Sequence, residues 1–150
     1  MADAVLLKEE RDGLVRLTLN RPEVMNSFNF ALLRALKAEI EALRFRPEVR
    51  VVVITGAGDK AFCAGADLKE RATLSPLQVK EFIYTIRDLF TQIEDLNKPV
   101  VAAVHGVCVG GGLELILACH YRIATRDPGT RFGFPEVKLG IFPGFNGTVR

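Results

Sequence analysis

Two glutamates stand in apolar, glycine-rich parts of the sequence. Glu114 interrupts the apolar stretch 113–119, and Glu136 is the only acidic residue between positions 132 and 144. A buried carboxylate costs free energy unless it has a partner or a chemical role. Two such carboxylates can divide acid and base roles when their surroundings separate their pKa values. The alternative for Glu114 is a satisfied buried side chain behind a glycine turn.

Two glycine-rich turns accompany these glutamates. The first, Gly110 to Gly112, lies between the apolar run 100–104 and the stretch that contains Glu114. Peptide N–H groups at a helix start lack intrahelical partners and carry partial positive charge, so such a turn can bind an anion or an oxyanion. The second is GAGDKAFCAGADLKE, residues 56–70, in which Gly65 stands between two alanines. Taken alone, this second segment favours an ordinary strand-to-helix loop.

Other chemistries lack their sequence patterns. Ser27 and Ser75 do not have the glycine context of a nucleophilic serine, and segment 56–70 matches neither the phosphate-binding loop nor the dinucleotide motif. The histidines and cysteines show no separated ligand pairs, so we expect no metal; they are His105, Cys108, Cys119 and His120. What remains is two carboxylates and two backbone turns, which can offer two N–H donors to one developing oxyanion.

The composition indicates one folded domain. The chain has 150 residues, of which 49% are hydrophobic and 25% charged, enough for a core of its own. A net charge of +2 is too small to suggest nucleic acid or membrane partners. No stretch reaches membrane-spanning length, and the first residues lack the pattern of a signal peptide. Three cysteines without disulfide spacing predict reduced thiols, hence a cytoplasmic protein of the bacterial cytosol or, as the alternative, of an organellar matrix.

Hydrophobic periodicity predicts alternating strands and helices, and therefore an α/β fold. Helices are expected over residues 30–43, from Ser75 to the stop signal at 97–99, and over 113–119. Strands are expected at 14–20, 51–55, 100–104 and 121–125. Ser75, Pro76 and Gln78 form a capping-box signal at the start of the second helix. Residues 23–29 and 132–144 are expected to be irregular.

Four segments, in this order, closely resemble the enoyl-CoA hydratase/isomerase (crotonase) superfamily: LNRPEVMNSF, AFCAGADLKE, KPVVAAVHGVCVGGGLELILAC and FGFPEVKLGIFPG. The resemblance covers nearly the whole chain, and AFCAGADLKER and GGGLELILAC are especially similar to the methylglutaconyl-CoA and short-chain hydratase branches. It implies a crotonase-like spiral of ββα units, usually assembled as a homotrimer or a hexamer of two stacked trimers. It also implies that residues 1–150 form an acyl-CoA-binding catalytic core.

The resemblance assigns roles to individual residues. The N–H groups of Ala66 and Gly111 match the two oxyanion donors, and Glu114 and Glu136 match the catalytic pair. The CoA and thioester channel would be lined by Ala64, Ala66, Asp67, Leu68 and Lys69, together with Gly111. The loop around Val24 would help to seat the adenine end. Coenzyme A is then part of the acyl-CoA substrate, and no separate cofactor is expected.

The implied reaction is syn addition of water to a 2-enoyl-CoA, giving a 3-hydroxyacyl-CoA. The presence of two glutamates favours this over a 3,2-enoyl-CoA isomerase, which commonly needs one acid at the Glu136 end. A methylglutaconyl-CoA hydratase is a further alternative, and an RNA-binding protein on the same scaffold is a fourth. RNA binding would need a basic comb on an exposed helix. Here the basic residues of 34–50 are interspersed with Glu39, Glu41 and Glu48, which disfavours RNA binding.

Two features depart from the family pattern. Phe134 precedes the Pro-Glu pair where many hydratases have a polar residue, which bears on the acyl pocket. The sequence also ends before the C-terminal helical segment of the family, so we expect a core truncated at its C-terminus. Phe134, Ile141, Phe142 and Phe145 crowd this end, and the helix around 79–93 carries a long apolar stripe. We expect these side chains to need a following helix or a neighbouring subunit, and residues 1–150 alone to be a poor enzyme.

Overall fold

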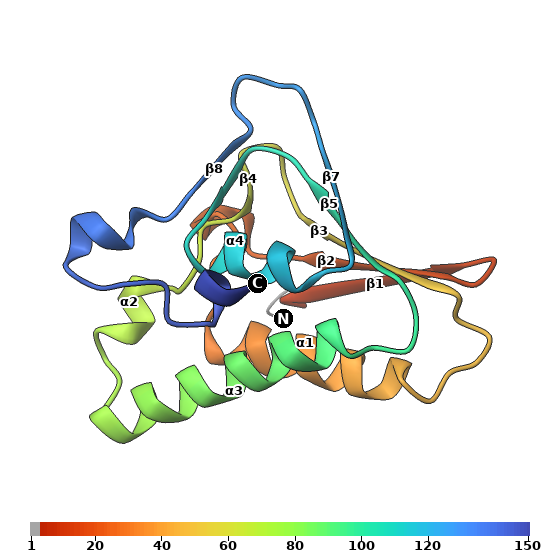
Figure 1. The fold of residues 1–150 in the computed structure, drawn as a ribbon, viewed down its shortest axis with the longest axis horizontal. Helices are drawn as coiled ribbons and strands as arrows, with labels where there is room; N and C mark the ends of the chain where they lie inside the picture. The colour runs from red at the N-terminus through yellow and green to blue at the C-terminus, as the bar shows by residue number, and fades with distance from the viewer. Residues whose placement is uncertain (1–3) are drawn as a thin grey trace.

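The computed structural model describes residues 4–150 and is organised around a five-stranded sheet (Figure 1). Its strands follow the order β1-β2-β3-β5-β7, and they are β1 (Leu6–Arg11), β2 (Leu14–Leu19), β3 (Val51–Gly56), β5 (Val100–Val104) and β7 (Tyr121–Ala124). β1 and β2 form an antiparallel hairpin, and the other pairings are parallel. The hairpin turn is two residues long, and both Asp12 and Gly13 have positive φ, which matches the twist of the flanking strands.

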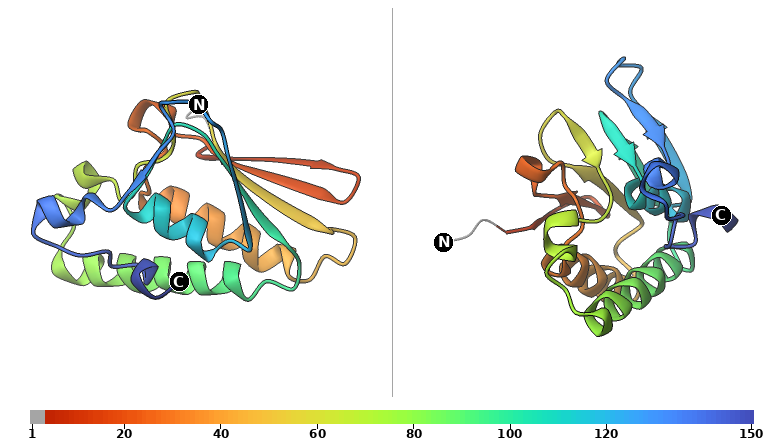
Figure 2. Two further views of the ribbon diagram at one scale, coloured as in Figure 1. Left: turned by 45° about the horizontal axis from the view of Figure 1, so that its top comes forward. Right: turned by 90° about the vertical axis from the view of Figure 1, so that its left-hand side faces the viewer.

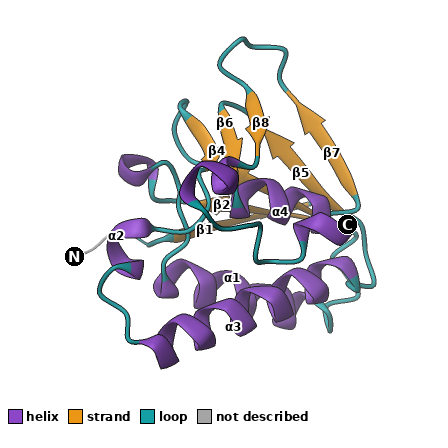
Figure 3. Ribbon diagram, turned by 60° about the vertical axis from the view of Figure 1, so that its left-hand side comes forward, coloured by secondary structure: helices purple, strands orange, loops and turns teal. Residues whose placement is uncertain are grey.

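A second, three-stranded sheet stands beside the first (Figure 3). It consists of β4 (Ala61–Cys63), β6 (Val107–Val109) and β8 (Arg131–Gly133), all parallel, in the order β4-β6-β8. Each of its strands follows a strand of the large sheet along the chain, so that β3 leads to β4, β5 to β6 and β7 to β8. Helical segments follow each such pair of strands. This repeated path confirms the predicted α/β fold and the spiral of ββα units.

Two long helices form a layer below the large sheet (Figures 1 and 2). They are α1 (Phe30–Leu43) and α3 (Pro76–Glu94), which pack side by side. Asn29 caps α1 by accepting the N–H of Leu32. The predicted capping box of α3 is confirmed, since the Ser75 hydroxyl accepts the N–H of Gln78 and the Gln78 side chain accepts the N–H of Ser75.

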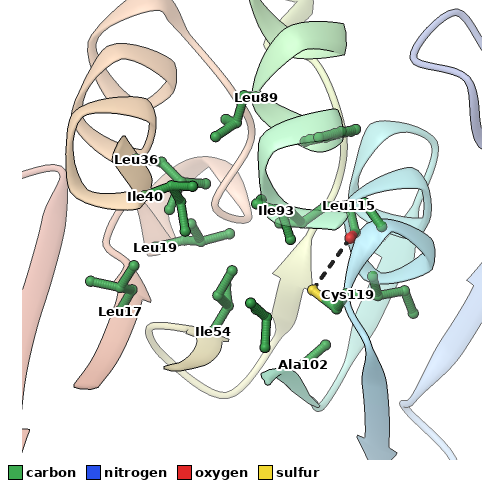
Figure 4. Close-up of a cluster of buried hydrophobic side chains, with 14 of the residues drawn as sticks. Leu17, Leu19, Leu36, Ile40, Ile54, Leu89, Ile93, Ala102, Leu115 and Cys119 are labelled. Atoms are coloured by element: carbon green, nitrogen blue, oxygen red, sulfur yellow. Dashed lines mark hydrogen bonds between the residues drawn. The ribbon is translucent and has the colours of Figure 1, made fainter. Parts of the chain in front are cut away.

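The core lies between this helical layer and the large sheet (Figure 4). It joins Leu17, Leu19, Ile54 and Ala102 of the sheet to Leu36 and Ile40 of α1, Leu89 and Ile93 of α3, and Leu115 and Cys119 at α4 (Gly111–Ala118). All three cysteines are free and buried. Burial raises the pKa of the Cys63 and Cys119 thiols to about 12, so these thiols stay protonated.

Several short elements escaped prediction. The segment 56–70 was expected to be a loop, but it contains β4. The segment 132–144 was expected to be irregular, but it contains the end of β8 and the 3-10 helix η2 (Pro135–Leu139). β4, β6 and β8 are three residues each and pair only with one another. Such strands are too short to show a period of two. The remaining short elements are η1 (Pro22–Val24), α2 (Leu68–Arg71) and η3 (Gly147–Val149).

The expectation that the C-terminal aromatic cluster needs an outside cover is only partly right. Phe145 is buried within this chain, and its ring packs against Phe82 and Phe90 with ring centroids 6.3 and 6.2 Å apart. The apolar stripe of α3 is also covered from within, since α1 and the sheet bury most of it. Ile141 and Phe142 do remain exposed. Among the helices of residues 4–150, none is long and apolar enough to cross a membrane.

Candidate active site

A pocket of about 500 Å³ opens where the turn after β4 meets the start of α4. Residues 64–66 and 68 line one side, and 110, 111 and 114 line another. Arg71, residues of the segment from Pro135 to Phe145, and Ile83 and Arg87 of α3 complete the wall. Both predicted glutamates and both glycine turns therefore contribute to one pocket, whose size is in the range of small-molecule sites.

Glycine brings the two turns into contact. Gly65 has φ +92, and a Cβ built on it would lie 3.0 Å from the backbone N of Gly111. Gly110, with φ +55 and ψ −128, adopts a backbone conformation that L side chains rarely adopt. Larger residues at either position would push the turns apart. The sequence pattern of glycines is therefore explained by the close approach of two backbones.

The N–H groups of Ala66 and Gly111 are the predicted oxyanion donors, and both residues line the pocket. Within residues 4–150, neither N–H donates a hydrogen bond to a protein acceptor. Gly111 is the first residue of α4, where the helix dipole adds positive potential. Two unpaired N–H donors from adjoining turns form an arrangement that can stabilise a developing oxyanion.

Glu114 is firmly held in the pocket wall. Its side chain is 1% exposed, and Oε1 accepts the N–H groups of Phe145 at 2.8 Å and Gly147 at 3.0 Å. Burial raises the pKa of this carboxyl above its ordinary value, and the nearby charge of Glu136 adds to the rise. The two N–H donors and the cation of Arg150 oppose the shift without cancelling it. Glu114 thus has partners, as a structural residue would, and it also faces the pocket.

Glu136 is held much more loosely. It lies in η2 and is 9% exposed, and its Oε2 is buried without a hydrogen-bond partner within the described residues. Its Oε1 lies 2.9 Å from the position that a Cβ on Gly110 would occupy. A buried carboxylate oxygen without a donor is unfavourable, so this atom is available to a ligand.

Asp67, a predicted binding residue, lies beside the pocket and has structural partners of its own. It does not line the pocket; its Oδ1 caps α2 by accepting the N–H groups of Lys69 and Glu70, and its Oδ2 accepts Arg21 Nη2 at 2.9 Å. Burial alone would raise the pKa of Asp67, but its bonds to Arg21 and to these N–H groups hold the pKa below its ordinary value. Arg21 also donates to the carbonyl of Ser27. This partly buried ion pair holds the turn that presents Ala66.

The remaining predicted binding residues are divided between the pocket and its surroundings. Ala64, Ala66, Leu68 and Gly111 line the pocket. Val24 in η1 and Lys69 in α2 do not line it, and Lys69 is exposed. Sequence reasoning missed three residues, namely Arg21, which is beside the Pro22 turn signal, and the pocket residues Arg71 and Arg87. Nothing in their local sequence distinguishes these arginines from surface cations.

Three basic residues of α1 and the following turn are paired with acids, whereas Arg44 and Arg50 donate to the carbonyls of Asp95 and Asp12. Arg34 contacts Glu81, and Lys37 pairs with Glu41 and Asp88. Arg46 pairs with Glu10 and Glu48. A nucleic-acid surface presents unpaired cations to phosphates. Neutralising pairs on this face do not fit that requirement.

Comparison with known proteins agrees with the predicted family. Residues 9–150 match the family described as enoyl-CoA hydratase/isomerase. The crotonyl-CoA hydratase of Syntrophomonas wolfei is 43% identical over all 150 residues, which is 57% of its own length. The mitochondrial methylglutaconyl-CoA hydratase of Homo sapiens is 42% identical over 144 residues, covering 96% of this chain and 42% of that protein. The crystal structure of enoyl-CoA hydratase from Bacillus anthracis superposes with a TM-score of 0.92 at 41% identity, over 97% of this chain and 56% of that one. The chain thus spans about half the length of these relatives.

Proposed function

The chain belongs to the enoyl-CoA hydratase/isomerase family, and we propose that the protein adds water in syn fashion to a 2-enoyl-CoA, giving a 3-hydroxyacyl-CoA. The observation that supports this most directly is the convergence of two carboxylates and two free N–H donors on one pocket. Coenzyme A enters as part of the substrate, and no other cofactor has a role in the proposed reaction. 

In the proposed reaction the thioester carbonyl accepts the N–H groups of Ala66 and Gly111. Their partial positive charge draws electron density from the conjugated double bond and leaves Cβ open to attack. Both donors are backbone groups fixed by close packing of glycine turns, so little reorganisation is needed as negative charge develops on the oxygen.

The two glutamates then hold and activate a water. Glu114 Oε1 is occupied by two N–H groups, which leaves Oε2 to take a proton from the water as its oxygen attacks Cβ. Glu136 delivers a proton to Cα through its unpartnered oxygen. One proton leaves the water and one reaches the carbon, so the thioester gains H and OH overall.

A crotonyl-CoA absorbance assay on the intact protein tests the proposal. Glu114→Gln and Glu136→Gln should each lower kcat by about 10²- to 10⁴-fold, the contribution of a general acid or base. The amide is nearly isosteric, and at position 114 it can still accept the N–H groups of Phe145 and Gly147, so the loss would be chemical. Full activity in both variants would overturn the assignment.

Double-bond isomerisation of a 3-enoyl-CoA is the second candidate. The loosely held Glu136, with one free oxygen, supplies the single acid and base that proton transfer between two carbons needs. Product analysis with 3-hexenoyl-CoA separates the two activities. A hydrated main product supports the hydratase, and 2-hexenoyl-CoA as the main product supports the isomerase.

We also propose that the protein works as a homotrimer or a hexamer in a reducing compartment, the cytosol or an organellar matrix. β7 is an edge strand of the large sheet and is exposed throughout, with Tyr121 and Ile123 among its residues. Phe142 is 75% exposed near the pocket. Exposed apolar edges of this kind favour association with another chain. Light scattering of the intact protein gives the oligomeric state, and a monomer would contradict this proposal.

A further inference from the structure

The peptide group between Gly144 and Phe145 joins Arg87 of α3 to Glu114 of α4. Its carbonyl accepts Arg87 Nε at 2.6 Å, and its N–H donates to Glu114 Oε1 at 2.8 Å. We infer that Arg87 is a positioning residue, whose charge acts on Glu114 through this peptide group and holds Glu114 as the base of the hydration. This inference rests on the proposed function and concerns the way in which the site holds its base.

Arg87 is a half-buried cation that lines the pocket. Within residues 4–150, its side chain takes part in no ion pair with a carboxylate. The bond from its Nε to Gly144 is at the short end of N–H···O distances, as expected for a charged donor. A cation that is partly withdrawn from water needs compensation, and a carbonyl polarised from its other end by a carboxylate supplies part of it.

A peptide group can transmit charge because its C=O and N–H dipoles are aligned. A cation at the oxygen draws electron density from the nitrogen and makes the N–H a stronger donor. Hydrogen bonds in such a chain strengthen one another, and they do so most where water is excluded. Phe145 is buried and Glu114 is 1% exposed, so the end of the chain at the carboxylate is screened little by water.

The second donor to Glu114 has no cation behind it. The N–H of Gly147 donates to the same Oε1 at 3.0 Å. Its peptide group carries the carbonyl of Asn146, which accepts the neutral backbone N–H of Val149 at 3.2 Å. Two peptide groups therefore end on one carboxylate oxygen, and the one that is bonded to Arg87 makes the shorter bond. This pair provides an internal comparison for the effect of the Arg87 charge.

Other groups around α4 also act on Glu114. Burial raises the pKa of Glu114, the N–H groups of Gly147 and Phe145 lower it, the charge of Glu136 raises it and that of Arg150 lowers it. Arg150 is itself paired with Glu94 of α3 at 2.9 Å. The strands that pack on α4 contribute only thiols, which burial keeps protonated by raising their pKa; they are Cys63 and Cys108. All these groups stay in place when Arg87 is replaced, so the replacement isolates its contribution.

Arg87→Gln and Arg87→Met separate the charge from the hydrogen bond. Gln carries a neutral N–H donor at the same position along the side chain as Arg Nε, and Met carries no donor. NMR of the intact protein follows the amide protons of Phe145 and Gly147. The Phe145 proton should move upfield from wild type to Arg87→Gln and further in Arg87→Met, whereas the Gly147 proton should move much less. Arg87→Gln keeps the bond to Gly144, so this comparison does not depend on how well Arg87→Met folds.

The pKa of Glu114, followed by NMR of its side-chain carboxyl and assigned with Glu114→Gln, should rise in the same order, because a weaker N–H donor stabilises the carboxylate less. The acidic limb of kcat/KM for crotonyl-CoA should therefore move to higher pH. We expect kcat to fall about tenfold in Arg87→Met, since a small displacement of a catalytic group is enough for such a loss. Arg71→Met is the matched control. Arg71 lines the same pocket without a side-chain hydrogen bond to residues 144–147, so its loss should leave the Phe145 proton and the acidic limb as in the wild type.

Equal shifts of the Phe145 and Gly147 protons would mean that the charge acts through space, and would overturn the inference. An unchanged pKa of Glu114 in Arg87→Gln would overturn it too, because the hydrogen bond alone would then suffice. A raised KM at constant kcat, with the Phe145 proton unchanged, would make Arg87 a substrate-binding residue instead. The NMR measurements need no turnover. If they give the expected order and no 2-enoyl-CoA is hydrated, the action of Arg87 on Glu114 is supported and the proposed function is overturned.

Discussion

The segment that contains Glu114 and the segment that contains Glu136 hold their carboxylates in different ways. α4 is packed inside the molecule, and Glu114 gives one oxygen to two backbone N–H groups at 2.8 and 3.0 Å. η2 lies at the surface, and Glu136 is its only buried residue. Val137 and Leu139, which follow Glu136 in η2, are exposed, and one oxygen of Glu136 has no donor within the described chain.

In the proposed reaction, this contrast would let one residue type serve two roles in a single pocket. A carboxylate fixed by two N–H groups keeps its position when the substrate enters, so it can orient a water. A carboxylate on a short surface segment with few buried neighbours can adjust as it transfers a proton. The local sequence is apolar and glycine-rich around both glutamates, and the difference comes from what the folded chain brings to each.

Among changes that leave both glutamates in place, moving the loosely held carboxylate should have the largest effect. In Gly110→Ala the new Cβ would lie 2.9 Å from Glu136 Oε1, and the φ of +55 would strain the turn that presents the Gly111 N–H. We expect kcat for crotonyl-CoA to fall by about 10²- to 10³-fold, the usual cost of a lost oxyanion donor. Gly133→Ala is the control, because a Cβ there meets nothing within 4 Å. Wild-type kcat in Gly110→Ala would show that neither the donor nor Glu136 needs its present position.

Removing each carboxylate in turn should lower the free energy of unfolding by different amounts. Glu114→Ala leaves the N–H groups of Phe145 and Gly147 buried without an acceptor, so the free energy of unfolding should fall by about 2 to 4 kcal/mol. Glu136→Ala breaks no hydrogen bond and should lower it by less than about 1 kcal/mol. Urea unfolding of the intact protein measures both. Equal losses in the two variants would contradict the contrast between a fixed and a loosely held carboxylate.

The sequence predicted the long helices and strands and identified the two glutamates. It did not predict the contacts that surround each glutamate. α1 and α3 were predictable because their apolar residues repeat at helical spacing and because Asn29 and Ser75 can cap them. The family resemblance identified Glu114 and Glu136, and the structure brings both into one pocket.

The contacts that distinguish the two glutamates join residues far apart in the chain. Phe145 and Gly147 lie 31 and 33 positions after Glu114, and only the fold places their N–H groups on its carboxylate. The small sheet was missed for the same reason, since each of its strands is stabilised by a strand from another turn of the spiral. Arg21 and Asp67 are 46 positions apart, which no local pattern can reveal.

The ion pair of Arg21 and Asp67 contacts neither Glu114 nor Glu136. Its loss should therefore leave one glutamate firmly held and the other loosely held, as in the wild type. Arg21→Met removes the partner that holds Asp67 in place. The turn that presents Ala66 then loses this support. We expect kcat to fall about tenfold, because a small displacement of one donor is enough for such a loss. The pH profile of kcat should keep its shape, which a direct effect on a glutamate would change. Arg11→Met is the control, since Arg11 forms an exposed pair with Asp12. A changed pH profile would contradict the positioning role.

The smallest expected effect is on the pH dependence of stability, and it concerns the fixed carboxylate. Burial raises the pKa of Glu114, with the charge of Glu136 adding to the shift and the N–H groups of Gly147 and Phe145 opposing it. A carboxyl whose pKa rises on folding binds more protons in the folded state than in the unfolded state, so its contribution to stability falls as pH rises. The fall begins near the ordinary value of 4.5 and is complete once the pH passes the raised value.

Glu114→Gln cannot ionise and keeps an acceptor for both N–H groups, so its contribution does not change over this range. The Tm of this variant minus that of the wild type should therefore increase as the pH rises from about 4.5 towards neutral. Thermal unfolding of both proteins in parallel, at a series of pH values and constant ionic strength, measures this difference. A difference that stays flat above about pH 4.5 and decreases only as the pH rises towards that value would mean that the two N–H groups and Arg150 outweigh burial, and that folding lowers the pKa of Glu114.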